Sequence, residues 1–151
     1  MIPSAARLCK TWPSVLSAAL RPAQKKGRRV PAEPLICIID DDASVRRTIV
    51  ALVRSAGYAA RGFASAEEFL GCGTIQAFAC IITDVQMPGM SGIELKQHLA
   101  ASQCLVPVIM ITARHDPGLE AQATASGAVS FLRKPLDAGA LIRCLEGALE
   151  A

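Results

Sequence analysis

Compact polar side chains follow four short apolar runs of the sequence. They comprise an acidic triplet, a fourth aspartate, a threonine and a lysine: Asp40, Asp41, Asp42, Asp84, Thr112 and Lys134. Carboxylates within a few ångströms of one another repel, and a hard divalent cation such as Mg²⁺ relieves that repulsion through oxygen ligands. A carboxylate can also attack phosphorus, while a cation, a hydroxyl and an ammonium group stabilise the phosphoryl oxygens. If the fold brings these side chains together, their chemistry is metal-assisted phosphoryl transfer to an aspartate.

Each of these residues taken alone has an ordinary structural explanation. Asp42 can cap a helix, Thr112 can hydrogen-bond within a loop, and Lys134 can be a surface lysine. The chemical interpretation therefore depends on the elements that place them, and on whether the ends of the apolar runs meet at one edge of a sheet.

Strand-like and helix-like patterns alternate five times between residues 35 and 150. The expected strands are residues 35–39, 58–63, 79–83, 107–111 and 128–132. Four of them are nearly continuous apolar runs, which is typical of strands buried on both faces. The run 58–63 is the weakest and fits an edge of the sheet.

Helix signals fill the gaps between these strands. One helix is marked by an apolar stripe that Gly57 terminates, and the stripe consists of Val45, Ile49, Leu52 and Ala56. Capping residues mark the starts of the others: Ser65 with Glu68, Ser91 with Glu94, Asp116 before Pro117, and Asp137. Residues 117–126 offer Leu119 and otherwise mainly alanines to a core. This helix is therefore either an element of low local stability that can shift or a small-residue helix packed tightly on the sheet.

The alternation predicts an α/β fold of the doubly wound class, with a five-stranded parallel sheet and five helices. Connection and handedness rules favour the flavodoxin-like strand order 2-1-3-4-5, with Rossmann-like relatives as the alternative. In the first order the switch point lies between strands 1 and 3. A ligand is then expected at the carboxyl ends of these strands, where the acidic triplet and Asp84 follow.

Charge divides the 151-residue chain into two unlike parts. The net charge is +3, but residues 1–34 carry seven basic side chains against Glu33 alone, which gives +6, and residues 35–151 carry −3. Five prolines in the first part predict a mostly disordered arm, followed by one globular domain over 35–151. Alternatives for the arm are an organellar transit peptide, a basic cluster at residues 25–29 that contacts nucleic acid or anionic lipid, and a true start of translation near Val30.

Cysteine usage and the lengths of the apolar runs bear on the compartment. The six cysteines include no Cys-x-x-Cys pair and no histidine partner at metal-ligand spacing, which predicts reduced thiols. His98 and His115 are expected to be ordinary surface residues. The longest apolar stretches fall far short of the roughly 20 residues that a membrane helix needs. A cytoplasmic location without a membrane span is therefore expected.

Four segments of the sequence resemble the response-regulator receiver domain of two-component systems. They are IIDDDASVR, ITDVQMPGMSG, VIMITA and AVSFLRKPL, in order and at the usual intervals of that family. The resemblance covers residues 35–149 and is closest to receivers of the FixJ/NarL type. No single segment is specific, but the four in register on five strand-helix units are. The departures, Asp42 and Leu136, do not touch the phosphoryl site.

The resemblance implies a role for each residue of a Mg²⁺ site. Asp84 would be the phosphoacceptor. Asp40 and Asp41 would form the acidic pair, with Asp41 binding the ion directly and Asp40 acting mainly through water. Gln86 would lend its backbone carbonyl to the same ion, and the side chains of Gln86 and Arg114 would tune the lifetime of the phosphoryl group.

The resemblance also implies a switch. Thr112 would be the switch hydroxyl that moves onto the phosphoryl group, and Phe131 would be the switch aromatic of the fifth strand. Lys134 would pair with the phosphoryl group, and the Lys134–Pro135 bond is often cis in this family.

As a whole, the resemblance implies a phosphoacceptor switch, which contributes to its own phosphorylation and dephosphorylation without being an enzyme in the ordinary sense. The donor would be a sensor histidine kinase or a phosphotransfer protein. Phosphorylation would switch the face formed by the fourth helix, the fifth strand and the fifth helix, which would bind a downstream partner or a second copy of the chain. Residues 35–151 leave no room for a DNA-binding output domain, so a single-domain regulator or a fragment of a longer one is expected.

Two other classes of function remain open from the residues. A haloacid-dehalogenase-type phosphatase also opens on an Asp-x-Asp motif after an apolar strand, and it would place the nucleophile at Asp40. That family normally needs a late acidic pair, and the late acids Asp116, Glu120 and Asp137 form no such pair at a strand end. A purely structural flavodoxin-like binding module would leave the converging acids unexplained.

Overall fold

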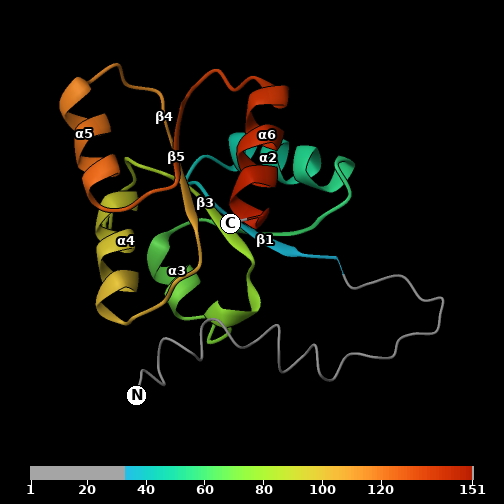
Figure 1. Cartoon of the computed structure of the whole chain (residues 1–151), viewed down its shortest axis with the longest axis horizontal. Helices are drawn as coiled ribbons and strands as arrows, with labels where there is room; N and C mark the ends of the chain where they lie inside the picture. Colours follow the sequence, from blue (N-terminus) through green and yellow to red (C-terminus); the bar gives the residue numbers. More distant parts are fainter. Residues whose placement is uncertain (1–32, 151) are drawn as a thin grey trace.

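Five parallel strands form one sheet, and helices cover both of its faces (Figure 1). The computed structural model of the protein describes residues 33–150. The strand order is β2-β1-β3-β4-β5, and every neighbouring pair is parallel. The predicted flavodoxin-like order is thus confirmed. The arm predicted for residues 1–34 lies outside the described residues, apart from its last two positions.

The strands begin and end within one or two residues of the predicted limits. They are β1 (Leu35–Ile39), β2 (Ala59–Phe63), β3 (Cys80–Asp84), β4 (Val108–Thr112) and β5 (Ser130–Arg133). The three inner strands are buried along almost their whole length, because each lies between two other strands and two layers of helices. The strand with the weakest apolar pattern, β2, is an edge strand as predicted.

The strand β5 departs from the prediction. Its apolar sequence led us to expect a strand buried on both faces, yet none of its four residues is fully buried. Phe131 and Leu132 are half-buried, and Arg133 is exposed. The reason is topological, because β5 has a neighbouring strand on one side only and forms the second edge of the sheet.

Five α-helices and one short 3₁₀ turn connect the strands within residues 33–150. They are α2 (Ala43–Ser55), α3 (Ala66–Leu70), the 3₁₀ turn (Ile75–Ala77), α4 (Gly92–Ala101), α5 (Pro117–Ala125) and α6 (Ala138–Glu150). The five predicted helices are therefore present. In α5 only Ala123 is fully buried and Leu119 is half-buried, so its apolar contact is as small as the sequence indicates.

The helices form two layers around the sheet. One face carries α2 and α6, and the other carries α3, α4 and α5 (Figure 1). Successive residues of a strand point to opposite faces, so Ile36 and Ile38 belong to the first core and Cys37 and Ile39 to the second. Burial raises the pKa of the Cys37 thiol and raises that of Cys80 to about 12, which keeps both thiols protonated and unreactive.

The apolar stripe of α2 is turned relative to the prediction. The buried residues are Ile49 and Val53, while Val45 and Leu52 are half-buried and Ala56 lies exposed beyond the end of the helix. A spacing of four residues therefore faces the sheet. The sequence could not decide this, because Leu52 and Val53 are both apolar and either one continues a helical stripe.

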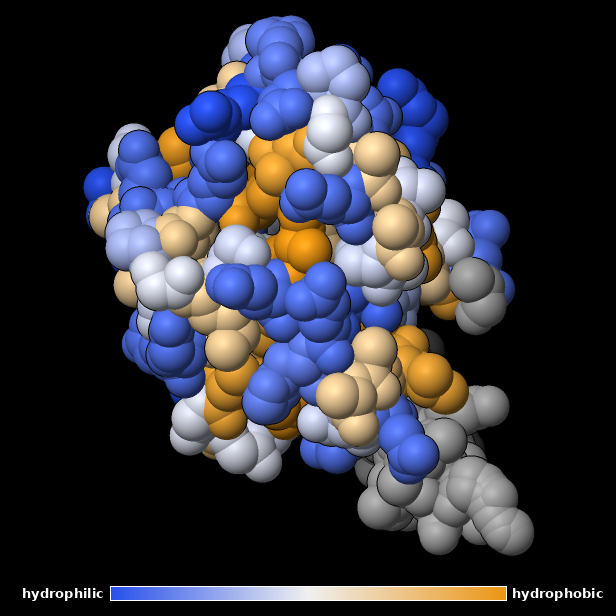
Figure 2. All heavy atoms as spheres, turned by 90° about the vertical axis from the view of Figure 1, so that its left-hand side faces the viewer, coloured by the Kyte–Doolittle hydropathy of each residue, from blue (hydrophilic) through white to orange (hydrophobic). Residues whose placement is uncertain are grey.

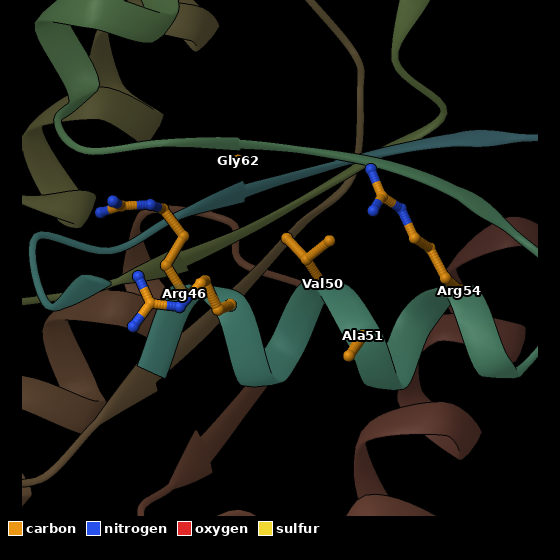
Figure 3. A pocket seen from close by; sticks show the side chains of 6 residues that line it. Arg46, Val50, Ala51, Arg54 and Gly62 are labelled. Atoms are coloured by element: carbon orange, nitrogen blue, oxygen red, sulfur yellow. The ribbon is translucent and has the colours of Figure 1, made fainter. Parts of the chain in front are cut away.

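Two arginines of α2 connect this helix to the sheet (Figure 3). Arg46 Nη1 donates to the backbone carbonyl of Asp40 over 2.7 Å, and Arg54 Nη2 donates to the carbonyl of Ala60 over 2.9 Å. The methylene groups of Arg46 pass so close to Gly62 that a Cβ there would lie 3.1 Å from them. The edge strand thus carries a glycine where an arginine of the helix crosses it.

Most of the predicted helix caps are present. Three aspartates and one serine-glutamate pair cap helices as expected: Asp42, Asp116, Asp137, and Ser91 with Glu94. The predicted capping box at Ser65 is only half formed. The Ser65 hydroxyl accepts from the Glu68 N–H, but the Glu68 carboxylate accepts from the N–H of Ala64, one residue further back.

The face of the domain that carries α4 and α5 is largely covered by hydrophilic side chains (Figure 2). On the side of α4 and α5, apolar surface shows in patches between hydrophilic side chains (Figure 2). Among the described residues, the large apolar side chains that are exposed are Leu105 and Val129. His98 and His115 are exposed, as predicted. Within residues 33–150, no helix is both long enough and apolar enough to cross a bilayer.

Candidate functional site

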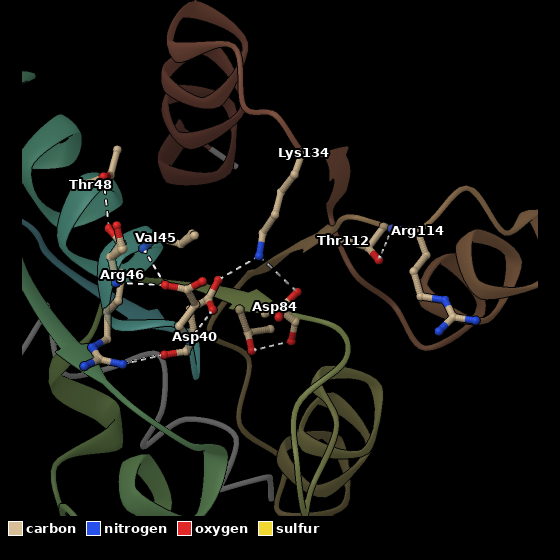
Figure 4. A network of polar contacts seen from close by, with 11 residues as sticks. Asp40, Val45, Arg46, Thr48, Asp84, Thr112, Arg114 and Lys134 are labelled. Carbon is tan, nitrogen blue, oxygen red and sulfur yellow. Dashed lines mark hydrogen bonds and ion pairs between the residues drawn. The ribbon is translucent and has the colours of Figure 1, made fainter.

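The polar residues predicted at the strand ends meet at one edge of the sheet (Figure 4). Asp40 directly follows β1, Asp84 is the last residue of β3, and Thr112 is the last residue of β4. Lys134 directly follows β5. Because all strands are parallel, their carboxyl ends lie side by side, and the register Ile39–Thr83 between β1 and β3 places Asp40 next to Asp84.

Three carboxylates form the centre of this edge. Asp40, Asp41 and Asp84 each offer an oxygen, and these oxygens lie within 4.8 Å of one another. Asp40 and Asp84 are buried, with 1% and 8% of their surface exposed, whereas Asp41 is exposed. The cluster is therefore a partly buried concentration of negative charge that is open to solvent on the side of Asp41.

Lys134 supplies the positive charge next to this cluster. Its Nζ lies 3.1 Å from Asp40 Oδ2 and 3.7 Å from Asp84 Oδ1. The backbone N–H of Lys134 donates to the carbonyl of Thr112 over 2.8 Å, which fixes the end of β5 to the end of β4. The Lys134–Pro135 bond is cis, in line with the resemblance. One ammonium group thus faces two carboxylates.

The balance of these charges is reflected in the pKa of Asp84. Burial raises the pKa of its carboxyl from 3.8 to about 6, and the neighbouring Asp40 and Asp41 raise it as well. Lys134 and the backbone N–H of Val85 act in the opposite direction. Desolvation and like-charge repulsion therefore outweigh the single lysine, and the cluster retains unbalanced negative charge.

The donor set fits a hard divalent cation. All candidate ligands are oxygens, and a cation between them would remove the repulsion that raises the pKa of Asp84. Both oxygens of Asp40 already accept hydrogen bonds, Oδ1 from the N–H of Asp42 over 2.9 Å and Oδ2 from Lys134. Asp41 has no such protein donors among the described residues and faces solvent. This asymmetry favours Asp41 over Asp40 as a direct ligand.

The backbone around Asp84 is tightly constrained. The Thr83 hydroxyl donates to the Asp84 carbonyl over 3.0 Å. A Cβ at Gly92, the first residue of α4, would lie 2.5 Å from that same carbonyl oxygen, so only glycine fits there. The N–H of Gly92 also donates to the carbonyl of Val85 over 2.8 Å. The close approach of α4 thus holds the end of β3 in place.

The remaining predicted residues lie on the strands β4 and β5 and in the loops that follow β3 and β4. Thr112 is buried, and its hydroxyl accepts from the N–H of Arg114 over 3.1 Å (Figure 4). Gln86 and Arg114 are exposed, and Phe131 is half-buried in β5, paired in register with Met110. The structure therefore brings Asp40, Asp41, Asp84 and Lys134 into one cluster, with Thr112 at the end of the adjacent strand. Within the described range, no ion pair or hydrogen bond joins the side chains of Gln86, Arg114 or Phe131 to it.

One residue near the site could not be predicted from the sequence. The Glu67 carboxylate of α3 accepts a hydrogen bond from the N–H of Met90 over 2.9 Å, in the loop that follows Asp84. The two residues are separated by 23 positions, and neither the capping pattern nor the apolar periodicity connects them. The only local signal is Gly89, whose φ of +78° requires a glycine in that loop.

Comparisons with known proteins agree with this geometry. The family model described as the response regulator receiver domain matches residues 36–146. The chain is 38% identical over 114 residues to the transcriptional regulatory protein FixJ of Bradyrhizobium diazoefficiens, covering 76% of this chain and 56% of that protein. The chain spans about half the length of the curated relatives that it matches.

Solved structures give the same result. The crystal structure of FixJ-N superimposes with a TM-score of 0.74 at 32% identity, covering 80% of this chain and 96% of the other. The chemotaxis protein CheY4 of Vibrio cholerae superimposes with a TM-score of 0.71 at 30% identity, covering 78% of this chain and all of the other.

Proposed function

The chain belongs to the response regulator receiver domain family, and from that premise we propose that it accepts a phosphoryl group on Asp84 in a Mg²⁺-dependent reaction. Receiver domains of two-component systems are signalling switches. The observation that carries the proposal is the partly buried group of Asp40, Asp41 and Asp84, in which Asp40 and Asp84 are buried and Lys134 faces both of these carboxylates. A structural role alone would not require so much like charge in a buried position.

In the proposed reaction, a carboxylate oxygen of Asp84 attacks the phosphorus of a phosphohistidine on a histidine kinase or a phosphotransfer protein. The bond from phosphorus to the imidazole nitrogen breaks, and its electron pair returns to the imidazole. Only the ionised carboxylate can attack, and a pKa of about 6 leaves Asp84 largely ionised at neutral pH. Lys134, 3.7 Å from Asp84 Oδ1, is placed to stabilise the negative charge of the transferred group.

A bound Mg²⁺ would neutralise the carboxylates and the phosphoryl oxygens. Asp41, Asp84 and the backbone carbonyl of Gln86 would hold it directly, and Asp40 would act mainly through water. The side chains of Gln86 and Arg114, which are both exposed, would tune the lifetime of the phosphoryl group.

The response would pass through Thr112 and Phe131. The Thr112 hydroxyl would move from the N–H of Arg114 onto the phosphoryl group, and Phe131 would repack toward the space that it leaves. The affected face consists of α5, β5 and α6, where Arg133 of β5 forms an ion pair with Glu120 of α5 over 3.0 Å. This face would bind a downstream partner or a second copy. A kinase donor would place the domain over residues 35–151 in the cytoplasm.

The proposal is tested by labelling the protein with acetyl phosphate in the presence of Mg²⁺ and reducing the acyl phosphate with borohydride, which marks the modified aspartate for mass spectrometry. We expect the mark on Asp84 and no labelling of Asp84→Asn. Asp42→Asn is the matched control, because asparagine also caps helices and Asp42 lies outside the three-carboxylate cluster. Labelling of Asp40 that survives Asp84→Asn would instead support the phosphatase chemistry.

A further inference from the structure

The loop between β3 and α4, residues 85–91, is held at both of its ends by the backbone. At its start, the N–H of Val85 donates to the carbonyl of Ile111 over 2.9 Å. At its end, the N–H of Gly92 donates back to the carbonyl of Val85 over 2.8 Å. The stretch between them carries Gln86, whose carbonyl is the proposed metal ligand.

One side chain binds the backbone near the C-terminal end of this loop. Glu67 Oε2 accepts from the N–H of Met90 over 2.9 Å. Among the described residues, it is the side chain that hydrogen-bonds the backbone of residues 86–90. A carboxylate that accepts a backbone N–H makes a charge-assisted hydrogen bond, which is stronger than a neutral one. Glu67 therefore adds a polar contact to a segment that is otherwise held by the apolar packing of Met87 and Met90.

The glycine next to Met90 makes room for this contact. Gly89 has a φ of +78°, and a Cβ on it would lie 2.6 Å from Glu67 Oε2. Any other residue would push the carboxylate away from the loop, in addition to straining the backbone. Gly89 and Glu67 thus fit one another as a pair, although they belong to different elements.

The helix that carries Glu67 is itself firmly anchored. Ala66 and Phe69 of α3 are fully buried, and the Phe69 ring packs edge-on against Phe63 and Phe78 at centroid distances of 5.4 and 5.6 Å. The Ser65 hydroxyl caps the start of the helix. A glutamate on such a support can fix a loop, because its own backbone does not move with the loop.

We propose that Glu67 is a positioning residue for the phosphorylation site. By binding the N–H of Met90, it holds the loop in the conformation that directs the Gln86 carbonyl to the carboxylate cluster, and so lowers the Mg²⁺ concentration at which Asp84 reacts. The inference rests on the proposed function for its consequence, but the contact between Glu67 and the loop does not.

The experiment compares Glu67→Ala with Glu68→Ala in the full chain. Glu68 is the matched control, since it lies in the same helical turn with the same charge and its carboxylate binds only the N–H of Ala64, four residues earlier, among the described residues. We expect Glu67→Ala to shift the amide NMR signal of Met90 without Mg²⁺. We also expect it to weaken Mg²⁺ binding, measured by calorimetry, by about three- to tenfold. The rate of labelling by acetyl phosphate at saturating Mg²⁺ should be unchanged.

Two further variants separate positioning from charge and from folding. Glu67→Gln keeps an acceptor oxygen but makes the weaker, neutral hydrogen bond, so we expect it to lose about twofold in Mg²⁺ affinity, clearly less than Glu67→Ala. Gly89→Ala places a methyl group against the carboxylate and should raise the required Mg²⁺ concentration as Glu67→Ala does. Circular dichroism melting identifies any variant that fails to fold.

The outcomes are distinct from those that test the proposed function. Equal Mg²⁺ affinities for Glu67→Ala and Glu68→Ala, with Asp84→Asn unlabelled, would overturn the positioning role alone. Equal losses in Glu67→Gln and Glu67→Ala would also overturn it, because they would show that charge and not the hydrogen bond matters. Labelling that persists in Asp84→Asn would overturn the proposed function, while the Met90 signal would still report the loop contact.

Discussion

Two clusters of like charge lie near one another in this domain, and they are balanced differently. The acidic cluster of Asp40, Asp41 and Asp84 lies at the carboxyl ends of the strands. The arginine groove lies on α2 against β2, has a volume of about 350 Å³, and is lined by Arg46, Arg47, Val50, Ala51, Arg54 and Gly62 (Figure 3). The two clusters are joined by one hydrogen bond, which Arg46 donates to the backbone carbonyl of Asp40.

The difference between them is in burial and in partners. Arg47 and Arg54 are exposed and Arg46 is half-buried, so water screens their mutual repulsion. Arg46 and Arg54 also donate hydrogen bonds to backbone carbonyls, and these bonds connect the helix to the sheet. Asp40 and Asp84 are buried and share one lysine. Like charge therefore indicates a reactive site only where it is buried and left unbalanced.

Removal of divalent cations should have the largest effect of the changes considered, and it should act on the acidic cluster and not on the arginine groove. With the chelator EDTA, we expect the rate of labelling by acetyl phosphate to fall by roughly a hundredfold, since the charge of the transferred group would then be stabilised by Lys134 alone. Adding Mg²⁺ back should restore the rate. An unchanged rate in EDTA would mean that the acidic cluster works without a cation. It would contradict the explanation that the two clusters differ because only the acidic one has unbalanced charge.

A smaller but more specific effect is expected on folding. In EDTA at neutral pH, Asp84→Asn should raise the free energy of unfolding by about 1 to 3 kcal/mol, because it removes the buried charge that raises the pKa of Asp84. Urea titration measures this change. The gain should shrink when Mg²⁺ is added to both proteins, because the cation then neutralises the original carboxylate.

The sign of the pH dependence follows from the direction of the shift. The pKa of Asp84 is about 6 in the folded chain and near its ordinary 3.8 in the unfolded one, so the folded state holds this proton more tightly. The stability that this group contributes is present below pH 3.8 and is lost as the pH rises through 6. The advantage of Asp84→Asn should thus be complete above pH 6 and vanish toward pH 3.8. A constant advantage would contradict the electrostatic explanation.

The convergence of these acids could be predicted from the sequence, because the carboxyl ends of parallel strands all lie at the same edge of a sheet. Apolar runs that end in Asp40 and Asp84 predict both the strands and their convergence. The same reasoning placed β2 at one edge, and the predicted order placed β5 at the other, but the apolar run of β5 wrongly suggested burial on both faces. Its apolar composition describes what a strand can pack against, and the number of neighbours is a property of the whole sheet.

Contacts between distant elements could not be read from the sequence. The hydrogen bond from Met90 to Glu67 spans 23 positions, and the carbonyl partners of Arg46 and Arg54 are backbone atoms, which have no sequence identity. From composition alone, the arginines of α2 look like a solvated face. Only the three-dimensional structure distinguishes Arg54, which binds a backbone carbonyl of the sheet, from an exposed residue such as Arg47.

That distinction gives the smallest expected effect. Arg54→Ala removes the donor to the carbonyl of Ala60, in a nearly buried position of β2, and should lower the free energy of unfolding by about 1 kcal/mol. Arg47→Ala, in the same groove but without such a bond among the described residues, should change it by less than about 0.5 kcal/mol. Both values should be the same with and without Mg²⁺, unlike that of Asp84→Asn. Equal losses for the two arginines would show that general charge, and not the carbonyl contact, holds α2 to the edge strand.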